Sequence, residues 1–186
     1  MYNKFVNFLK QHNLYDEEIF DFYWNNSFMF DYLDDELREF IGCYFIFDKS
    51  KHLKKIMICI PFASDDKTVL INVHEYVHVF LMYPYINKKC KIGMDIEALA
   101  IFYEKLYLLE NSSPELIEFA NYLDSKIFYA NKGEYVLAFM IKDKLNELYN
   151  KGYNIEKLEK TAKRLVKKEV IKSNIIDLKN KMINNK

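Results

Sequence analysis

Hydrophobic side chains recur at helical spacing through the first forty residues of the chain. Apolar residues three or four positions apart lie on one face of a helix, so this recurrence is typical of an amphipathic helix. Residues 2–40 are therefore predicted to be helical, with a break near 24–26. The two apolar stripes consist of Phe5, Phe8 and Leu9, and then of Phe28, Phe30, Leu33, Leu37 and Phe40.

Two short segments have the composition of β-strands instead. Residues 42–48 (GCYFIFD) and 55–61 (KIMICIP) are rich in aromatic and β-branched side chains, and the polar stretch KSKHLK separates them. This order predicts a β-hairpin. Pro61 is expected to end the second strand, because proline cannot donate a hydrogen bond to a neighbouring strand.

Helical spacing returns after the hairpin. Residues 65–83 begin with acidic side chains, which favour a helix N-terminus. Asp95 is the predicted N-cap of the next helix, which ends at the breaker over 111–114. Three further amphipathic segments follow at 114–130, 134–150 and 154–172.

The predicted fold is α+β and mostly helical, with a small antiparallel sheet ahead of the main helices. We expect a single domain over 1–186, because a chain of this length rarely forms more. It consists of an N-terminal helical region (1–41), a central region with the sheet and two helices (42–112), and a C-terminal helical region (113–186).

The composition limits the classes of partner and the cellular compartment that we expect for the protein. Hydrophobic residues make up 51% of the 186 residues, and 27 basic side chains balance 27 acidic ones. A neutral chain lacks the basic excess of a general nucleic-acid-binding protein, so no nucleic-acid partner is expected. The chain shows no signal peptide or membrane span, and its three cysteines form no pairing pattern. We therefore expect a cytoplasmic protein without a membrane partner.

One pentapeptide, His74-Glu75-Tyr76-Val77-His78, carries the strongest chemical signal. Side chains four positions apart share one face of a helix, so both imidazoles can bind one metal ion from the same side. Glu75 lies about 100° further round the helix, where its carboxylate reaches a water molecule on the metal. Zinc makes such a water more acidic, and the carboxylate then removes its proton. The pentapeptide predicts a site for one Zn²⁺ ion with Glu75 as the general base.

A catalytic zinc needs a third protein ligand and an open fourth position. No histidine follows His78 in the chain, so the third ligand is expected to be a carboxylate. The next predicted helix offers three candidates, which are Asp95, Glu97 and Glu104.

The motif and the following helix resemble the gluzincin metallopeptidases, in which His-Glu-x-x-His is followed by a glutamate ligand on a neighbouring helix. Eighteen residues separate His78 from Glu97, which is similar to the spacing in the aminopeptidase-N branch. The resemblance implies that Glu97 is the third ligand. It also implies that Glu104, two helical turns further on, accepts a hydrogen bond from a ligand imidazole. The short chain looks most like the small stand-alone minigluzincins, some of which are held latent by their own chain.

The same resemblance implies how a substrate is bound. In such enzymes the edge strand of a small sheet binds an extended peptide by β-augmentation, and strand 55–61 is that edge or its neighbour. A tyrosine beyond the motif stabilises the transition state. Tyr129 is the predicted donor, and Tyr135 is the alternative. The aminopeptidase motif Gly-x-Met-Glu-Asn does not occur upstream, so exopeptidase specificity is not predicted.

Two functions remain open from the sequence. The first is a zinc-dependent peptidase, active or latent, that hydrolyses bonds in a peptide or protein substrate. The second is a catalytically lapsed protein of the same fold that serves as a protein-interaction module. The first is favoured because a lapsed site has no reason to retain the base Glu75. Neither function predicts a particular oligomeric state.

Overall fold

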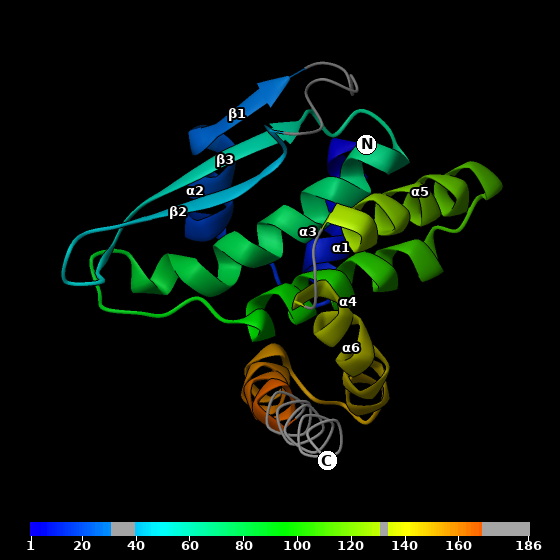
Figure 1. Ribbon diagram of the computed structural model, residues 1–186. Helices are drawn as coiled ribbons and strands as arrows, with labels where there is room; N and C mark the ends of the chain where they lie inside the picture. The colour runs from blue at the N-terminus through cyan, green and yellow to red at the C-terminus, as the bar shows by residue number, and fades with distance from the viewer. Residues whose placement is uncertain (31–39, 131–133, 169–186) are drawn as a thin grey trace, which may run out of the picture.

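A computed structural model shows an α+β fold that is mostly helical, which confirms the predicted fold class (Figure 1). The structure describes residues 1–30, 40–130 and 134–168, and the side chains of these residues other than 124–130 and 134–140. Within this described part of the chain, no helix has both the length and the apolar character needed to cross a membrane.

The N-terminal region is divided more finely than predicted. Helix α1 spans Tyr2–Gln11 and helix α2 spans Glu17–Asn26. The break between them arises because Asp16 caps α2, where its carboxylate accepts a hydrogen bond from the Ile19 amide (3.0 Å). Helix α2 ends at the predicted break.

The predicted helix over the following residues is wrong where the structure describes them. Ser27–Phe30 forms strand β1, which pairs in parallel with strand β3. Apolar residues two positions apart, such as Phe28 and Phe30, suit the period of a strand as well as part of a helical stripe. These residues form a strand because β3 has a free edge with which they can pair. Residues 31–39, which hold the rest of the predicted stripe, lie outside the described residues.

Strands β2 (Gly42–Phe47) and β3 (Leu53–Pro61) form the predicted antiparallel hairpin, and Pro61 is the last residue of β3. Strand β1 joins the other side of β3, so the sheet is mixed and its order is β1-β3-β2. The second strand of the hairpin is therefore the central strand and the neighbour of two edges, β1 on one side and β2 on the other.

The helices after the hairpin follow the prediction as far as the structure describes them, and residues 169–172 of the last predicted helix lie outside the described residues. Their bounds are Asp66–Met82 (α3), Met94–Glu110 (α4), Pro114–Ala130 (α5), Glu134–Asn150 (α6) and 155–168, with a short 3₁₀ turn at Tyr83–Tyr85.

The predicted N-cap of α4 is wrong. Gly93 occupies that position and Asp95 is buried in the first turn. The helix starts earlier because the Ile96 amide already donates to the Gly93 carbonyl (3.2 Å).

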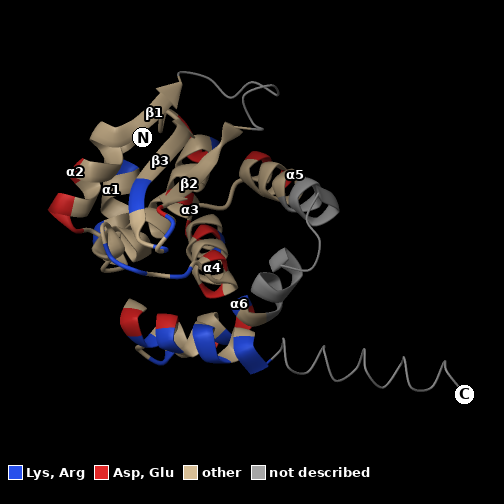
Figure 2. Ribbon diagram, turned by 60° about the vertical axis from the view of Figure 1, so that its left-hand side comes forward, with Lys and Arg blue, Asp and Glu red and all other residues tan. Residues whose placement is uncertain are grey.

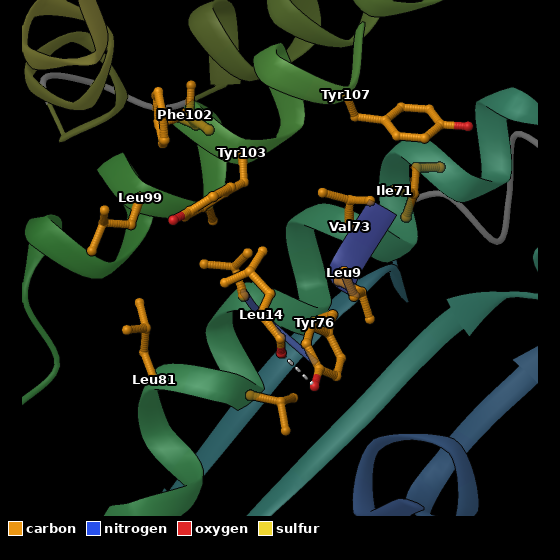
Figure 3. Close-up of a cluster of buried hydrophobic side chains, with 14 of the residues drawn as sticks. Leu9, Leu14, Ile71, Val73, Tyr76, Leu81, Leu99, Phe102, Tyr103 and Tyr107 are labelled. Atoms are coloured by element: carbon orange, nitrogen blue, oxygen red, sulfur yellow. Dashed lines mark hydrogen bonds between the residues drawn. The ribbon is translucent and has the colours of Figure 1, made fainter. Parts of the chain in front are cut away.

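Helix α3 lies between the sheet and α4 (Figure 1). Its apolar side chains pack on both sides, so this helix forms the centre of the core. In Figure 3 the ring of Tyr76 points toward Leu14, and the Tyr76 hydroxyl donates to the Leu14 carbonyl (3.1 Å). Close packing of this kind holds the polar residues of α3 in fixed positions.

Asn72 is a fully buried amide that connects α3 with two other elements. Its Nδ2 donates to the carbonyls of Pro61 and Thr68 (both 2.8 Å), and its Oδ1 accepts from the Tyr23 hydroxyl (3.1 Å). All of these groups are away from solvent, so the hydrogen bonds that the asparagine side chain makes with them have no replacement from water.

Replacing Asn72 with leucine is expected to lower the free energy of unfolding by about 2–4 kcal/mol, because buried polar groups lose their partners. Chemical denaturation followed by circular dichroism measures this change. Asn121→Leu is the matched control, since Asn121 is exposed on α5 and the substitution should cost less than about 0.5 kcal/mol. Equal losses in the two variants would contradict the assigned role.

Candidate metal centre

Helix α3 carries three polar side chains in its packed middle section. The side chains of His74 and His78 are only 12% and 11% exposed, and Glu75 is 8% exposed. Buried polar and charged groups are costly unless a partner satisfies them. The three side chains therefore need hydrogen bonds, opposite charges or a metal ion to offset the cost of their burial.

Glu97, in the first turn of α4, brings its carboxylate to the two imidazoles. Its oxygens lie 3.2 Å from Nε2 of His74 and 3.2 Å from Nε2 of His78, and the two Nε2 atoms are 3.3 Å apart. These three residues form a group that could hold a metal ion, and Asp95 is not part of it. The packing of α4 on α3 thus brings together the three ligands inferred from the resemblance.

The spacing of the ligand atoms suits a small metal ion. Atoms about 2.0–2.1 Å from a tetrahedral zinc are about 3.3–3.4 Å from one another. The distance between the two imidazole nitrogens is close to this value, and so is the distance from each of them to the nearer Glu97 oxygen, which is Oε1 for His74 and Oε2 for His78. In addition, Oε1 of Glu97 is buried without a hydrogen-bond donor among the described residues. Such an oxygen is costly unless a cation binds it. The residues present therefore fit a zinc ion.

Glu104 holds the ring of His74 from the side opposite Glu97. Its Oε2 lies 2.8 Å from Nδ1 of His74, and its Oε1 accepts a hydrogen bond from Nζ of Lys105 (2.9 Å). A carboxylate on Nδ1 fixes the proton there, so Nε2 of the neutral ring keeps its lone pair for a metal. The arrangement matches the role inferred for Glu104. The contact with Lys105 had no signal in the sequence.

The charges around the triangle favour a cation. Burial alone would lower the pKa of His74, but the carboxylates of Glu97 and Glu104 raise it well above its ordinary value. Burial alone would raise the pKa of Glu97, yet the two imidazoles lower it well below its ordinary value. Glu75 adds a third carboxylate nearby, so three carboxylates surround the two imidazoles. A divalent ion would balance this excess of negative charge.

Strand β2 packs at two points against α3, the motif helix that carries the His-Glu-x-x-His pentapeptide. The sequence did not predict these contacts. The Cys43 thiol donates to the backbone carbonyl of Glu75 (3.3 Å), and the ring centroids of Phe45 and His78 are 6.3 Å apart. Burial and the Glu75 carboxylate raise the pKa of the Cys43 thiol well above its ordinary value, so this thiol stays protonated. The alternation of side chains along a strand was the available signal, since positions 43 and 45 face the same side.

The side chains of Tyr129 and Tyr135 lie outside the described residues. Tyr129 belongs to α5 and Tyr135 to α6. The choice between them as a transition-state donor therefore stays a prediction.

Replacing Glu104 with alanine is expected to weaken zinc binding by about 10- to 100-fold, because the His74 ring loses the group that orients it. Competition against a chromophoric chelator measures the affinity. Glu118→Ala, at an exposed position of α5, is the control and should bind zinc as the wild type does. Unchanged affinity in the Glu104 variant would show that the contact does not support the ligand.

The arrangement combines a triangle of ligands with an adjacent carboxylate. Three protein ligands leave one position of a tetrahedral zinc open, which is typical of catalytic sites, whereas structural zinc sites have four protein ligands. Comparison of the chain with models of known protein families, with curated proteins and with solved structures finds no match.

Proposed function

We propose that the protein is a zinc-dependent peptidase whose metal is held by His74, His78 and Glu97. The observation that carries the proposal is the convergence of three residues of α3 and α4, in which the two imidazole nitrogens lie 3.3 Å apart and each lies 3.2 Å from one oxygen of the Glu97 carboxylate. Glu75 lies on the same helix as the two histidines. Three ligands, an open position and a neighbouring carboxylate are the parts that zinc-dependent hydrolysis requires.

Each part has a chemical role in the proposal. When bound, zinc would lower the pKa of a water molecule and polarise the carbonyl of the scissile bond. Glu75 would take the proton from that water and deliver it to the departing amine. Glu104 would keep His74 in the tautomer with a free Nε2. Tyr129, or Tyr135 in its place, would donate a hydrogen bond to the carbonyl oxygen as negative charge develops there.

Strand β2 offers a place for the substrate. It pairs with β3 on one side, and no strand among the described residues pairs with its other edge. The contacts of Cys43 and Phe45 set this strand beside the motif helix. An extended peptide that adds to the free edge by backbone hydrogen bonds would lie next to the ligand triangle. We therefore propose an extended segment of a peptide or protein as the substrate.

The same residues weigh against a catalytically lapsed interaction module. Such a module needs neither a general base nor an open metal position. Here Glu75 is retained and buried beside the triangle, although burying a carboxylate is costly. A role as general base in a peptidase explains why a carboxylate is buried at this position.

The purified protein is expected to cleave unstructured peptides only when it is loaded with zinc, because the base alone cannot activate water sufficiently. A chelator should abolish cleavage, and zinc added back in stoichiometric amount should restore it. Mass spectrometry of a peptide mixture identifies the products, and metal analysis verifies each state. Cleavage that continues after verified removal of the metal would contradict the proposal.

A further inference from the structure

Seven exposed lysines gather at one end of the sheet. They lie on the turn between β2 and β3, at the start of β3, and on the loop between α3 and α4. Figure 2 shows the loop as a largely blue segment that leads into α4. We call this group the lysine cluster, and its members are Lys49, Lys51, Lys54, Lys55, Lys88, Lys89 and Lys91.

Backbone hydrogen bonds join the two segments that carry the lysine cluster. The Leu53 amide donates to the Lys88 carbonyl (3.0 Å), and the Asn87 amide donates to the Leu53 carbonyl (2.7 Å). The Cys90 amide donates to the Lys51 carbonyl (3.2 Å). Lys51 and Asn87 have positive φ angles of 64° and 62°, which the tight turns require. The cluster is therefore one fixed surface.

Within its own two segments, the lysine cluster has little negative charge to offset it. On α2, Glu18 accepts a hydrogen bond from the Tyr83 hydroxyl, where the connection from α3 to α4 begins (2.6 Å). Asp48 is the one acidic residue within 48–55, and 84–94 contains none. Its carboxylate is engaged in the turn, where it accepts hydrogen bonds from the backbone amides of His52 and Ser50 (both 2.9 Å), which lower its pKa. Lys54 lies 3.7 Å from it, and the described residues provide no ion pair for the other six lysines. A concentrated positive surface of this kind attracts an anionic partner.

Strand β2 leads from the ligand triangle to the lysine cluster. Position 45 lies beside His78, and the turn that carries the first lysines begins at position 48. A strand rises about 3.3 Å per residue, so the turn lies about 10 Å further along. A peptide on the free edge of β2 would therefore reach the lysines of the β2–β3 turn a few residues to one side of its scissile bond. The loop lysines lie on the other side of β3, where they add to the positive potential at this end of the sheet.

We infer that the lysine cluster selects acidic peptides as substrates of this site. Glutamate or aspartate side chains on the part of the peptide beyond β2 would pair with the lysines. The inference rests on the proposed function, because it assigns a substrate class to the proposed peptidase. Exposed ion pairs are weak singly, but several acting together give a preference of about tenfold at low salt. Salt would reduce this preference by screening.

Binding is tested with the full chain carrying Glu75→Gln, so that no peptide is cleaved during the measurement. The probes are fluorescein-labelled peptides with an alanine and leucine centre. Glutamates stand at the N-terminal end in one peptide and at the C-terminal end in another, and glutamines replace them in a third. By fluorescence anisotropy, one of the glutamate peptides should bind about tenfold more tightly than the glutamine peptide. Which one does so also gives the direction of the peptide along β2.

Two triple variants and a matched control show which lysines cause the preference for the glutamate peptide. Lys49, Lys51 and Lys54 are changed to glutamine in one variant, and Lys88, Lys89 and Lys91 in another. The first variant should lose most of the preference for glutamate, because its lysines lie nearest the end of β2, and the second should lose a smaller part. The control makes the same change in charge on the helix over 155–168, at the exposed positions Lys160, Lys167 and Lys168, and should keep the preference. A preference that survives both cluster variants, or that the control also loses, would overturn the inference.

The failures of the inference and of the proposed function are distinguishable. Equal cleavage of glutamate and glutamine peptides by the zinc-loaded wild type would overturn the inference and support the peptidase. Lysine-dependent binding of the glutamate peptide without any cleavage would overturn the peptidase and support the lysine cluster as a docking surface for acidic peptides. Phosphatidylserine vesicles and a single-stranded oligonucleotide serve as further probes. Binding of either through the same lysines, with no binding of the glutamate peptide, would also overturn the inference.

Discussion

Changing Glu75 to glutamine is expected to lower kcat/KM for peptide hydrolysis by about 10²- to 10⁴-fold while zinc stays bound. The amide has nearly the shape of the carboxylate, but it cannot take a proton from water at neutral pH. The ligand triangle belongs to other side chains, so the metal should not be lost. Initial rates on a quenched peptide and zinc content per chain give the two quantities.

Glu118→Gln is the control for this substitution, because Glu118 is an exposed carboxylate of α5. It should hydrolyse peptides at the rate of the wild type. If the Glu75 variant were equally active, Glu75 would not be the base. If it lost zinc, the residue would support the metal rather than the proton transfer.

Changing Glu97 to alanine is expected to abolish stoichiometric zinc binding, because two imidazoles alone make a weak site. The wild type should gain thermal stability from zinc, since a ligand that binds only the folded state stabilises it. With free zinc at about one hundred times the Kd, the gain is about 2.7 kcal/mol, or roughly 5–10 °C in Tm for a chain of this size. Differential scanning fluorimetry with and without zinc should show this shift in the wild type and lose it in the variant.

Asp95→Asn is the matched control for Glu97, because Asp95 is a buried acid in the same helical turn but outside the ligand triangle. This variant should keep the zinc-dependent shift. Wild-type zinc affinity in Glu97→Ala would place the third ligand elsewhere. The proposed peptidase site would then fail.

The motif was predictable because its information is local. The spacing of His74 and His78 on one helix fixes their relation whatever the rest of the fold does. Prediction of the third ligand required more than local spacing. The residues alone left Asp95, Glu97 and Glu104 as candidates, and the resemblance selected Glu97. The structure separates the three by packing: Glu97 faces the imidazoles, Glu104 lies behind one of them, and Asp95 faces the helix over 155–168, where Lys163 lies 4.0 Å away.

What the sequence could not predict depends on contacts between distant segments. Strand β1 forms because β3 offers an edge to pair with, and a short apolar run does not reveal such a neighbour. The position of Cys43 beside Glu75 depends on how the sheet lies on α3. The lysines of two separate loops become one surface only through the hydrogen bonds between 51–53 and 86–90. A sequence with a formal charge of zero conceals such a local concentration.

The ligand triangle draws on α3 and α4 alone, which follow each other in the chain and are connected by residues 83–93. A bound ion would therefore act as a cross-link within this single helical pair, and it would not clamp the sheet or the C-terminal helices to it. Because α3 and α4 also pack together through buried apolar side chains, loss of such an ion would remove the cross-link and leave the two helices in contact.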